Sequence, residues 1–298
     1  MTVFFRTTGT VAGPEFFLRR RGGGLKRVRL PVTVALIERP DGLVLVDTGW
    51  SRRTCAFPQD DPGRATALFL GLEVHAEDAM ASQVIGAGYS PDDVKHIVAT
   101  HLHTDHVGGV VDFPRATLHA TRTEWDALGG GRLRGYDTRL RDLSPRTKLH
   151  DLTGEPALGF GASHDLFGDG TVLLLDAGGH TAGSVAVAVR LEQGWFIHAG
   201  DAAMFREDYR DEMAGGRSLY ARVNTRDPVR QRTSWRALHE AERVHEARVV
   251  PSHDPAVFET LPHTREDGWK TAWDKKPGRP QQEKKPREPK VPQPERKP

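Results

Sequence analysis

Cysteine is almost missing from this chain of 298 residues, in which Cys55 is the only one. A single cysteine cannot form a disulfide within the chain, and it cannot build a cysteine-based zinc site. Any metal site in this sequence must therefore use histidine and carboxylate ligands. The chain contains 14 histidines and 40 acidic residues that can supply them.

Long apolar runs are missing as well. No stretch approaches the roughly eighteen continuous apolar residues of a membrane-spanning helix, and the start MTVFFRTTGT does not continue into a signal-type apolar run. Neither GxGxxG nor GxxxxGK[ST] occurs, so nothing predicts a nucleotide cofactor. From these absences we expect a soluble, cytoplasmic globular protein without a membrane partner.

Positive charge is concentrated at the C-terminus. Residues 270–298 contain ten Lys or Arg and four Asp or Glu, so the formal charge of +2 leaves the first 269 residues at −4. A slightly acidic body argues against a nucleic-acid partner, because backbone binding needs a basic surface. Residues 271–298, rich in Pro, Lys and Glu, predict a disordered tail after a single domain at 1–270. The basic segment 19–29 predicts a glycine-rich surface loop.

Strand and helix patterns are mixed along the domain. Residues 32–38 and 43–49, with a turn between them, predict a β-hairpin. Helical spacing near 77–87, and again from Pro228 onward, predicts two helices. Other apolar runs predict buried strands at 96–100, 116–120, 171–177, 184–191, 195–201 and 247–254.

The hexapeptide HLHTDH at 101–106 follows the apolar run 96–100 directly, so four potential metal ligands begin where a strand ends. Neutral imidazole and carboxylate groups bind zinc and similar ions at about 2.0 to 2.2 Å. One small ion cannot accept all of these side chains. Two ions roughly 3.5 to 4 Å apart would resolve the crowding, if more ligands and a bridging anion come from elsewhere.

Three further ligand-type residues each follow an apolar run. His180 comes after the strand at 171–177, while Asp201 and His253 lie at the ends of the next strands. We expect these strand ends to share one edge of a sheet. The sequence therefore predicts a single site with seven candidate ligands.

Five short motifs occur in order along the chain. They are VDTG at 46–49, HLHTDH at 101–106, GHTAGS at 179–184, GD at 200–201 and SHD at 252–254. Together they resemble the motifs of the metallo-β-lactamase superfamily, over residues 32 to 260. The resemblance implies an α+β fold, a four-layer αββα sandwich with metals at one edge of the facing sheets. It also implies two divalent ions, with zinc expected and manganese or iron as alternatives.

The same resemblance implies a role for each candidate. A bridging hydroxide between the two ions would be the nucleophile of a metal-assisted hydrolysis, because the two cations lower the pKa of the shared water. The implied ligands are His101, His103 and His180 for the first ion, Asp105, His106 and His253 for the second, and Asp201 as the bridge.

Two of these aspartates, Asp105 and Asp201, are the predicted catalytic residues, and Asp105 is expected to shuttle the proton. Asp47, in the VDTG turn, is not a ligand in this pattern. We expect it to orient the loop by hydrogen bonding, with a simple turn aspartate as the alternative.

The flanking segments 88–109 and 119–125 are most similar to those of N-acyl homoserine lactonases, which implies the opening of an acyl lactone ring and quorum quenching. The histidine at 103 argues against the flavodiiron branch, which has a glutamate there. His253 argues against the β-lactamases that use a cysteine ligand. An esterase or phosphotriesterase on the same fold, an RNA-processing nuclease and a non-catalytic metal-binding protein remain alternatives.

One residue departs from the lactonase pattern. Such lactonases commonly have a tyrosine three positions after the bridging aspartate, whereas this chain has Met204, which cannot donate a hydrogen bond. Tyr209 or Tyr220 replaces that donor only if the fold returns its hydroxyl group to the site where the missing tyrosine would lie. Met204 and Phe205 form either an apolar wall for an acyl chain or part of the core.

The remaining histidines are expected to be structural or solvated, without convergent partners. His198 is the candidate exception, because it is three residues from Asp201, although alternation along its strand would equally bury it against the second sheet. These nine residues are His75, His96, His119, His150, His164, His198, His239, His245 and His263.

Overall fold

The computed structural model of the protein describes residues 1–19, 23–131, 134–210, 217–262 and 270–271. The predicted tail lies outside the described residues except for Thr271, and so does His263. Among the described residues, no helix is long and apolar enough to cross a membrane.

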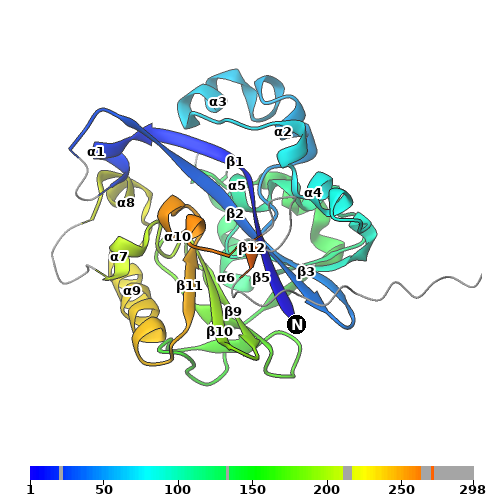
Figure 1. The fold of residues 1–298 in the computed structure, drawn as a ribbon, viewed down its shortest axis with the longest axis vertical. Helices are drawn as coiled ribbons and strands as arrows, with labels where there is room; N and C mark the ends of the chain where they lie inside the picture. Colours follow the sequence, from blue (N-terminus) through cyan, green and yellow to red (C-terminus); the bar gives the residue numbers. More distant parts are fainter. Residues whose placement is uncertain (20–22, 132–133, 211–216, 263–269, 272–298) are drawn as a thin grey trace, which may run out of the picture.

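Two β-sheets face each other, and helices cover their outer faces (Figure 1). The predicted four-layer αββα sandwich is confirmed. The first sheet has the order β12 (Lys270–Thr271), β1 (Thr2–Pro14), β2 (Arg27–Arg39), β3 (Gly42–Val46), β4 (Val94–Val98), β5 (Thr117–Thr121) and β6 (Thr147–His150). The second has the order β11 (Arg248–Pro251), β10 (Gly194–Gly200), β9 (Val185–Leu191), β8 (Val172–Asp176) and β7 (Ser163–Asp165).

Most helices are short, and several of them follow strand ends. The longest, α9 (Pro228–Arg243), begins with Pro228 after the Asp227 side chain, which accepts hydrogen bonds from the first-turn N–H groups. The others are α1 (Glu15–Leu18), α2 (Arg52–Ala56), α3 (Arg64–Leu70), α4 (Met80–Gly86), α5 (Thr104–Val107), α6 (Arg122–Ala127), α7 (Arg206–Arg210), α8 (Leu219–Asn224) and α10 (Pro255–Glu259).

Three apolar clusters fill the spaces between the four layers. On β3, Leu43 and Leu45 pack into the cluster under the helices, whereas Val44 and Val46 pack between the two sheets. Strands that are buried on both faces need nearly continuous apolar sequence, which is why these runs stand out. The third cluster lies between the second sheet and α9, where the predicted apolar face is buried as Trp235, Leu238 and Ala241.

The predicted hairpin and the six predicted buried strands are all present, with shifted ends. β1 was not predicted. In this long strand the register shifts between Thr7 and Thr10, and Gly9 has a φ of 93°. A bulge of this kind interrupts the period-two pattern that identifies a strand. The prediction of a surface loop at 19–29 was wrong at its end, because β2 already begins at Arg27.

Candidate metal centre

The candidate ligands lie where strands from both sheets end. His101 follows β4, Asp201 follows β10 and His253 follows β11, while His180 lies in the loop between β8 and β9. Because β4 is parallel to β3 and β5, and β10 is parallel to β11, these carboxyl ends meet at one edge of the sandwich. The topology thus brings together residues that are up to 152 positions apart in the chain.

The first group consists of His101, His103 and His180, each of which offers a ring nitrogen within 4.8 Å of the others. His103 Nδ1 and His180 Nε2 are 3.2 Å apart. Burial lowers the pKa of His103 to about 3, and it also lowers the pKa of His101 and His180. All three imidazoles are therefore neutral near pH 7, which is the form that binds metal.

The second group consists of Asp105, His106 and His253. One carboxylate oxygen of Asp105 lies 3.6 Å from the Nε2 atoms of both histidines. Burial opposes the charged form of these histidines, but the negative charges of Asp201 and Asp105 raise the pKa of both above the usual value. The two carboxylates therefore favour a positive charge at the position that these two histidines face.

Asp201 lies between the two groups. Its Oδ1 atom is 3.2 Å from Nε2 of His106 and 3.2 Å from Nε2 of His253, whereas its Oδ2 atom is 3.5 Å from Nε2 of His180. Burial opposes ionisation, yet the neighbouring histidines hold the pKa of Asp201 well below the usual value. One carboxylate thus presents an oxygen to each group, as a bridging ligand must.

Unsatisfied polar atoms show that these residues fit metal ions. Nε2 of His101, Nε2 of His106 and Oδ1 of Asp201 are buried without a hydrogen-bond partner among the described residues. Leaving such atoms unpaired in a protein interior is costly, so native structures rarely do so. Lone pairs that converge at these distances match the ligand set of divalent ions such as zinc.

The opposite ring nitrogens are fixed by hydrogen bonds. His106 Nδ1–H donates to Asp47 Oδ2 at 2.7 Å, and His253 Nδ1–H donates to the carbonyl oxygen of Pro31 at 2.8 Å. These partners place the proton on Nδ1 and leave the Nε2 lone pair free toward the centre. The predicted hydrogen-bonding role of Asp47 is confirmed by this contact.

Asp47 also organises the turn that enters the hexapeptide. Its carboxylate accepts hydrogen bonds from the backbone N–H and the hydroxyl group of Thr100, both at 2.8 Å. Because the hydroxyl proton of Thr100 is donated to Asp47, the hydroxyl oxygen acts as an acceptor toward His101. It lies 3.1 Å from Nδ1 of His101 and accepts the hydrogen bond from that N–H group. One buried aspartate therefore orients His106 directly and His101 through Thr100.

Glu124 is a positioning residue that the sequence reasoning missed. This buried side chain on α6 accepts a hydrogen bond from the N–H of Leu102 at 3.1 Å and another from the N–H of Gly183 at 2.9 Å. It thereby ties the hexapeptide to the loop of His180. The available signal was the pattern Thr121-x-x-Glu124, which marks a helix start.

His198 is structural. Its Nε2–H donates to the carbonyl oxygen of Thr33 at 3.2 Å, and its Nδ1 accepts the N–H of Gly200 at 3.2 Å. Gly200 has a φ of 54°, and a Cβ atom there would lie 2.7 Å from Cβ of Thr100. Glycine is required at this close approach of the two sheets, immediately before Asp201.

Four of the remaining histidines do have convergent partners, so that expectation was wrong for them. His96, His119, His150 and His164 form a row, here called the histidine ladder, in which successive ring nitrogens are 3.0, 2.9 and 2.9 Å apart. The ladder crosses β4, β5, β6 and β7, and thus joins the two sheets. Residues this far apart in sequence, on four separate strands, give no local signal.

The two candidate tyrosines have different surroundings. Tyr209 is buried against α9, and its hydroxyl group donates to Glu242 at 2.8 Å. Tyr220, on α8, packs with Met204 against the apolar cluster that contains Phe205. Tyr220 therefore lies near Met204, whereas Tyr209 shares a cluster with Ala202 and Ala203.

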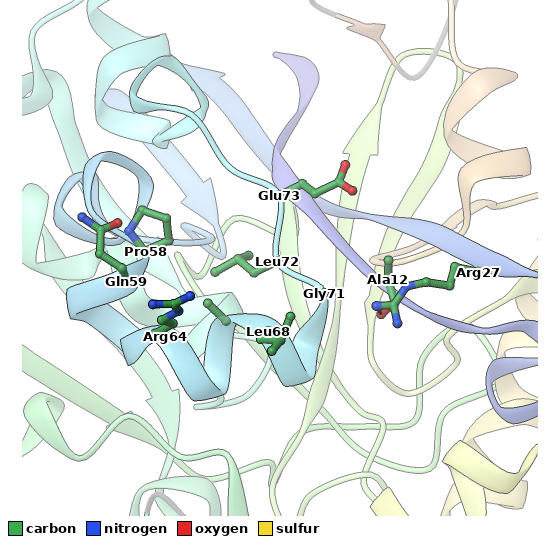
Figure 2. Close-up of a pocket in the computed structure, with 10 residues that line it drawn as sticks. Ala12, Arg27, Pro58, Gln59, Arg64, Leu68, Gly71, Leu72 and Glu73 are labelled. Carbon is green, nitrogen blue, oxygen red and sulfur yellow. Dashed lines mark hydrogen bonds between the residues drawn. The ribbon is translucent and has the colours of Figure 1, made fainter.

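A surface pocket of about 420 Å³ lies elsewhere, between α3 and the paired strands β1 and β2 (Figure 2). Arg64 and Leu68 on α3 line it together with Ala12 and Arg27. None of the seven candidate ligands lines this pocket, so it is separate from the metal centre.

Comparisons with known proteins agree with this fold. Residues 27–253 match the family described as the Metallo-beta-lactamase superfamily. A protein of Mycobacterium tuberculosis named "Probable metallo-hydrolase" is 35% identical over 244 residues, which cover 76% of this chain and 75% of that protein. The N-acyl homoserine lactonase AttM of Agrobacterium fabrum is 27% identical over 262 residues, or 86% of this chain and 94% of the lactonase.

A solved structure of an N-acyl homoserine lactone hydrolase with bound N-hexanoyl-L-homoserine has a TM-score of 0.70. It is 22% identical and covers 88% of this chain and 96% of its own, which shows the shared fold. The fold and the buried histidine and aspartate centre define the class of protein, a metal-dependent hydrolase. The chain belongs to the metallo-β-lactamase superfamily.

Proposed function

We propose that this protein opens the ring of an acyl lactone of the N-acyl homoserine lactone type at a centre of two divalent ions. The observation that carries the proposal is Asp201, whose two carboxylate oxygens face the two ligand groups separately. His101, His103 and His180 would hold one ion. Asp105, His106 and His253 would hold the other, with zinc the expected metal and manganese or iron as alternatives.

When bound, two such ions supply a shared hydroxide as nucleophile near neutral pH and polarise the substrate carbonyl group. The residues of the chain orient the reaction. Asp105 is the proposed proton carrier, since its side chain retains 26% exposure while those of His106, His253 and Asp201 retain 5% or less. As the more exposed of the two carboxylates, it can exchange a proton with solvent and deliver it to the ring oxygen that leaves.

Partly buried apolar side chains support an acyl substrate. Phe205 is buried in a cluster with Leu18 and Leu30, so it is part of the core. Met204 and Phe17 pack against this cluster and are only partly buried. An acyl chain of several carbons that packs against such side chains would gain stabilisation by leaving water.

The relatives support the substrate class, because several of them are named N-acyl homoserine lactonases. One structural neighbour with a TM-score of 0.60, a dizinc quorum-quenching lactonase, contains the product N-hexanoyl-L-homoserine. An esterase or phosphotriesterase would use the same centre, so substrate preference decides between them. If the substrate is a signalling lactone, the biological role is quorum quenching.

The test combines metal analysis with a substrate panel. Purified protein is expected to contain about two divalent ions per chain, to lose activity with a chelator and to regain it with metal. In a panel of acyl lactones of increasing chain length, aryl esters, phosphotriesters and a structured RNA, lactones should have the highest kcat/KM. One ion per chain, or preference for another substrate class, would contradict the proposal.

A further inference from the structure

Residues 135–137, here called the strap, run antiparallel to the hexapeptide of the metal centre. The backbone N–H of Asp137 donates to the carbonyl oxygen of Leu102 at 3.0 Å. The backbone N–H of Thr104 donates to the carbonyl oxygen of Gly135, also at 3.0 Å. The strap is thus bonded to the hexapeptide backbone on both sides of its second histidine.

This second histidine, His103, lacks the hydrogen bond that orients the other two histidines of the hexapeptide. In those two residues the outer ring nitrogen is bonded to Thr100 and to Asp47, respectively. Nδ1 of His103 faces His180, and its Nε2 forms no hydrogen bond among the described residues. Another contact must therefore fix the direction of this ring.

Packing against the strap takes the place of the missing hydrogen bond. The ring of Tyr136 lies edge-on to the ring of His103, with centroids 5.1 Å apart and an angle of 66° between the planes. Gly135 approaches the same imidazole so closely that a Cβ atom there would lie 3.2 Å from Cδ2 of His103. The direction of the imidazole therefore depends on where the strap lies.

A fork of hydrogen-bonded ion pairs from Arg139 holds the strap. Nε of Arg139 donates to Oδ1 of Asp137 at 2.8 Å, and Nη2 donates to Oδ2 of the same carboxylate. Nη1 of Arg139 donates to Oδ2 of Asp61 at 3.0 Å. The side chain of Asp137 retains only 3% exposure, and a carboxylate buried to this extent needs a positive partner.

Asp61 connects this fork to the helix that follows the VDTG turn. Its Oδ2 atom also accepts a hydrogen bond from the hydroxyl group of Thr54, on α2, at 3.0 Å. The turn itself is bonded to the hexapeptide, because the N–H of Thr48 donates to the carbonyl oxygen of His106 at 2.7 Å. Arg139 thus joins the strap to a second segment that is anchored on the hexapeptide.

We infer that Arg139 is a positioning residue for the first ligand group, because it fixes the strap that orients His103. The inference rests on the two-ion centre of the proposed function. Arg139 acts through the strap in this role and not on the substrate. Lysine cannot replace it, since a single ammonium group cannot reproduce the planar fork.

The first test removes the fork and keeps the charge. In Arg139→Lys the affinity for one of the two zinc ions should fall about tenfold, because His103 is no longer fixed, while the affinity for the other stays at the wild-type value. Competition between the apoprotein and a chromophoric chelator for zinc gives both dissociation constants. Arg29→Lys is the matched control, since Arg29 makes a similar two-contact pair with Glu73 at an exposed site.

A second pair of variants tests the contact with the ring itself. Gly135→Ala places a Cβ atom against His103 at a φ of 84°. Gly88→Ala, at a φ of 88°, adds similar backbone strain where no atom lies within 4 Å. Both variants should lose stability to a similar extent, but only Gly135→Ala should weaken the same zinc ion as Arg139→Lys.

These affinities are measured without substrate, so they are independent of the reaction. Wild-type protein that holds two ions and opens no lactone would refute the proposed function, and the zinc affinities would still decide the role of Arg139. Wild-type affinity for both ions in Arg139→Lys would overturn that role. An equal loss of both ions would overturn it as well, because it indicates a general loss of structure.

Discussion

Asp47 and His106 form a buried pair in which the histidine Nδ1 atom lies 2.7 Å from a carboxylate oxygen. Each side chain has 1% exposure. The aspartate comes from the turn after β3 and the histidine from α5, so the contact joins two segments 59 residues apart. It fixes the ring so that its other nitrogen faces Asp201.

Replacing Asp47 tests this orientation. Asp47→Asn keeps the size of the side chain but removes a charged acceptor, so metal affinity should fall by about 10- to 100-fold. Competition with a chromophoric chelator measures the effect. Asp41→Asn, at an exposed aspartate bonded to Arg39, is the control. Equal affinities in the two variants would show that the pair does not support the centre.

Replacing Asp201 tests the bridge. Asp201→Asn should reduce hydrolysis by more than about a hundredfold and lower the metal content below two ions per chain, because an amide is a poor bridging ligand. The fold should persist, since the side chain is not part of an apolar cluster. Metal analysis and circular dichroism check both points, with Asp126→Asn on the exposed face of α6 as control. Full turnover without Asp201 would mean that the bridge is misplaced.

Replacing Glu124 tests the link between the two loops. In Glu124→Gln one of the two N–H donors faces an amide N–H₂ group, so the free energy of unfolding should fall by about 1 to 3 kcal/mol. Metal affinity should fall as well, because the loops of His103 and His180 lose their common anchor. Chemical denaturation and chelator competition measure these effects. Glu77→Gln, at an exposed site, should change neither.

The histidine ladder should make stability depend on pH. Burial, followed by the charges of neighbouring imidazoles and Lys148, lowers the pKa of His119 to about 3 from an unfolded value of 6.5. Burial also lowers the pKa of His96 and that of His150, the latter to about 4, although Asp41 and Asp151 act in the opposite direction.

Below pH 6.5 the unfolded chain therefore binds protons that the folded ladder excludes. The free energy of unfolding should fall by up to about 1.4 kcal/mol per pH unit for buried His119, until the folded pKa is reached. Urea unfolding at pH 7.5 and pH 5 measures this slope. His119→Gln should show a shallower slope, whereas His245→Gln, at an exposed histidine, should keep that of wild type.

Much of the fold follows from local sequence. The apolar runs at 172–176 and 185–191 are buried on both faces, so their hydrophobicity alone marks them as strands. β1 escaped prediction because its bulge at Gly9 breaks the alternation. The short helices between 52 and 70 also gave no signal, since α3 buries none of its residues and so lacks an apolar face.

The seven candidate ligands were identified from the sequence because each one directly follows or lies near the end of an apolar strand. Their residue types determined the chemistry, as imidazole and carboxylate groups bind divalent ions. Only the tertiary structure decided which partners surround them. The contacts of Glu124 with Leu102 and Gly183, the histidine ladder and the ring contact of Tyr220 with Phe17 all join segments distant in sequence. Such contacts depend on how the two sheets stack, and no local pattern of residues encodes that arrangement.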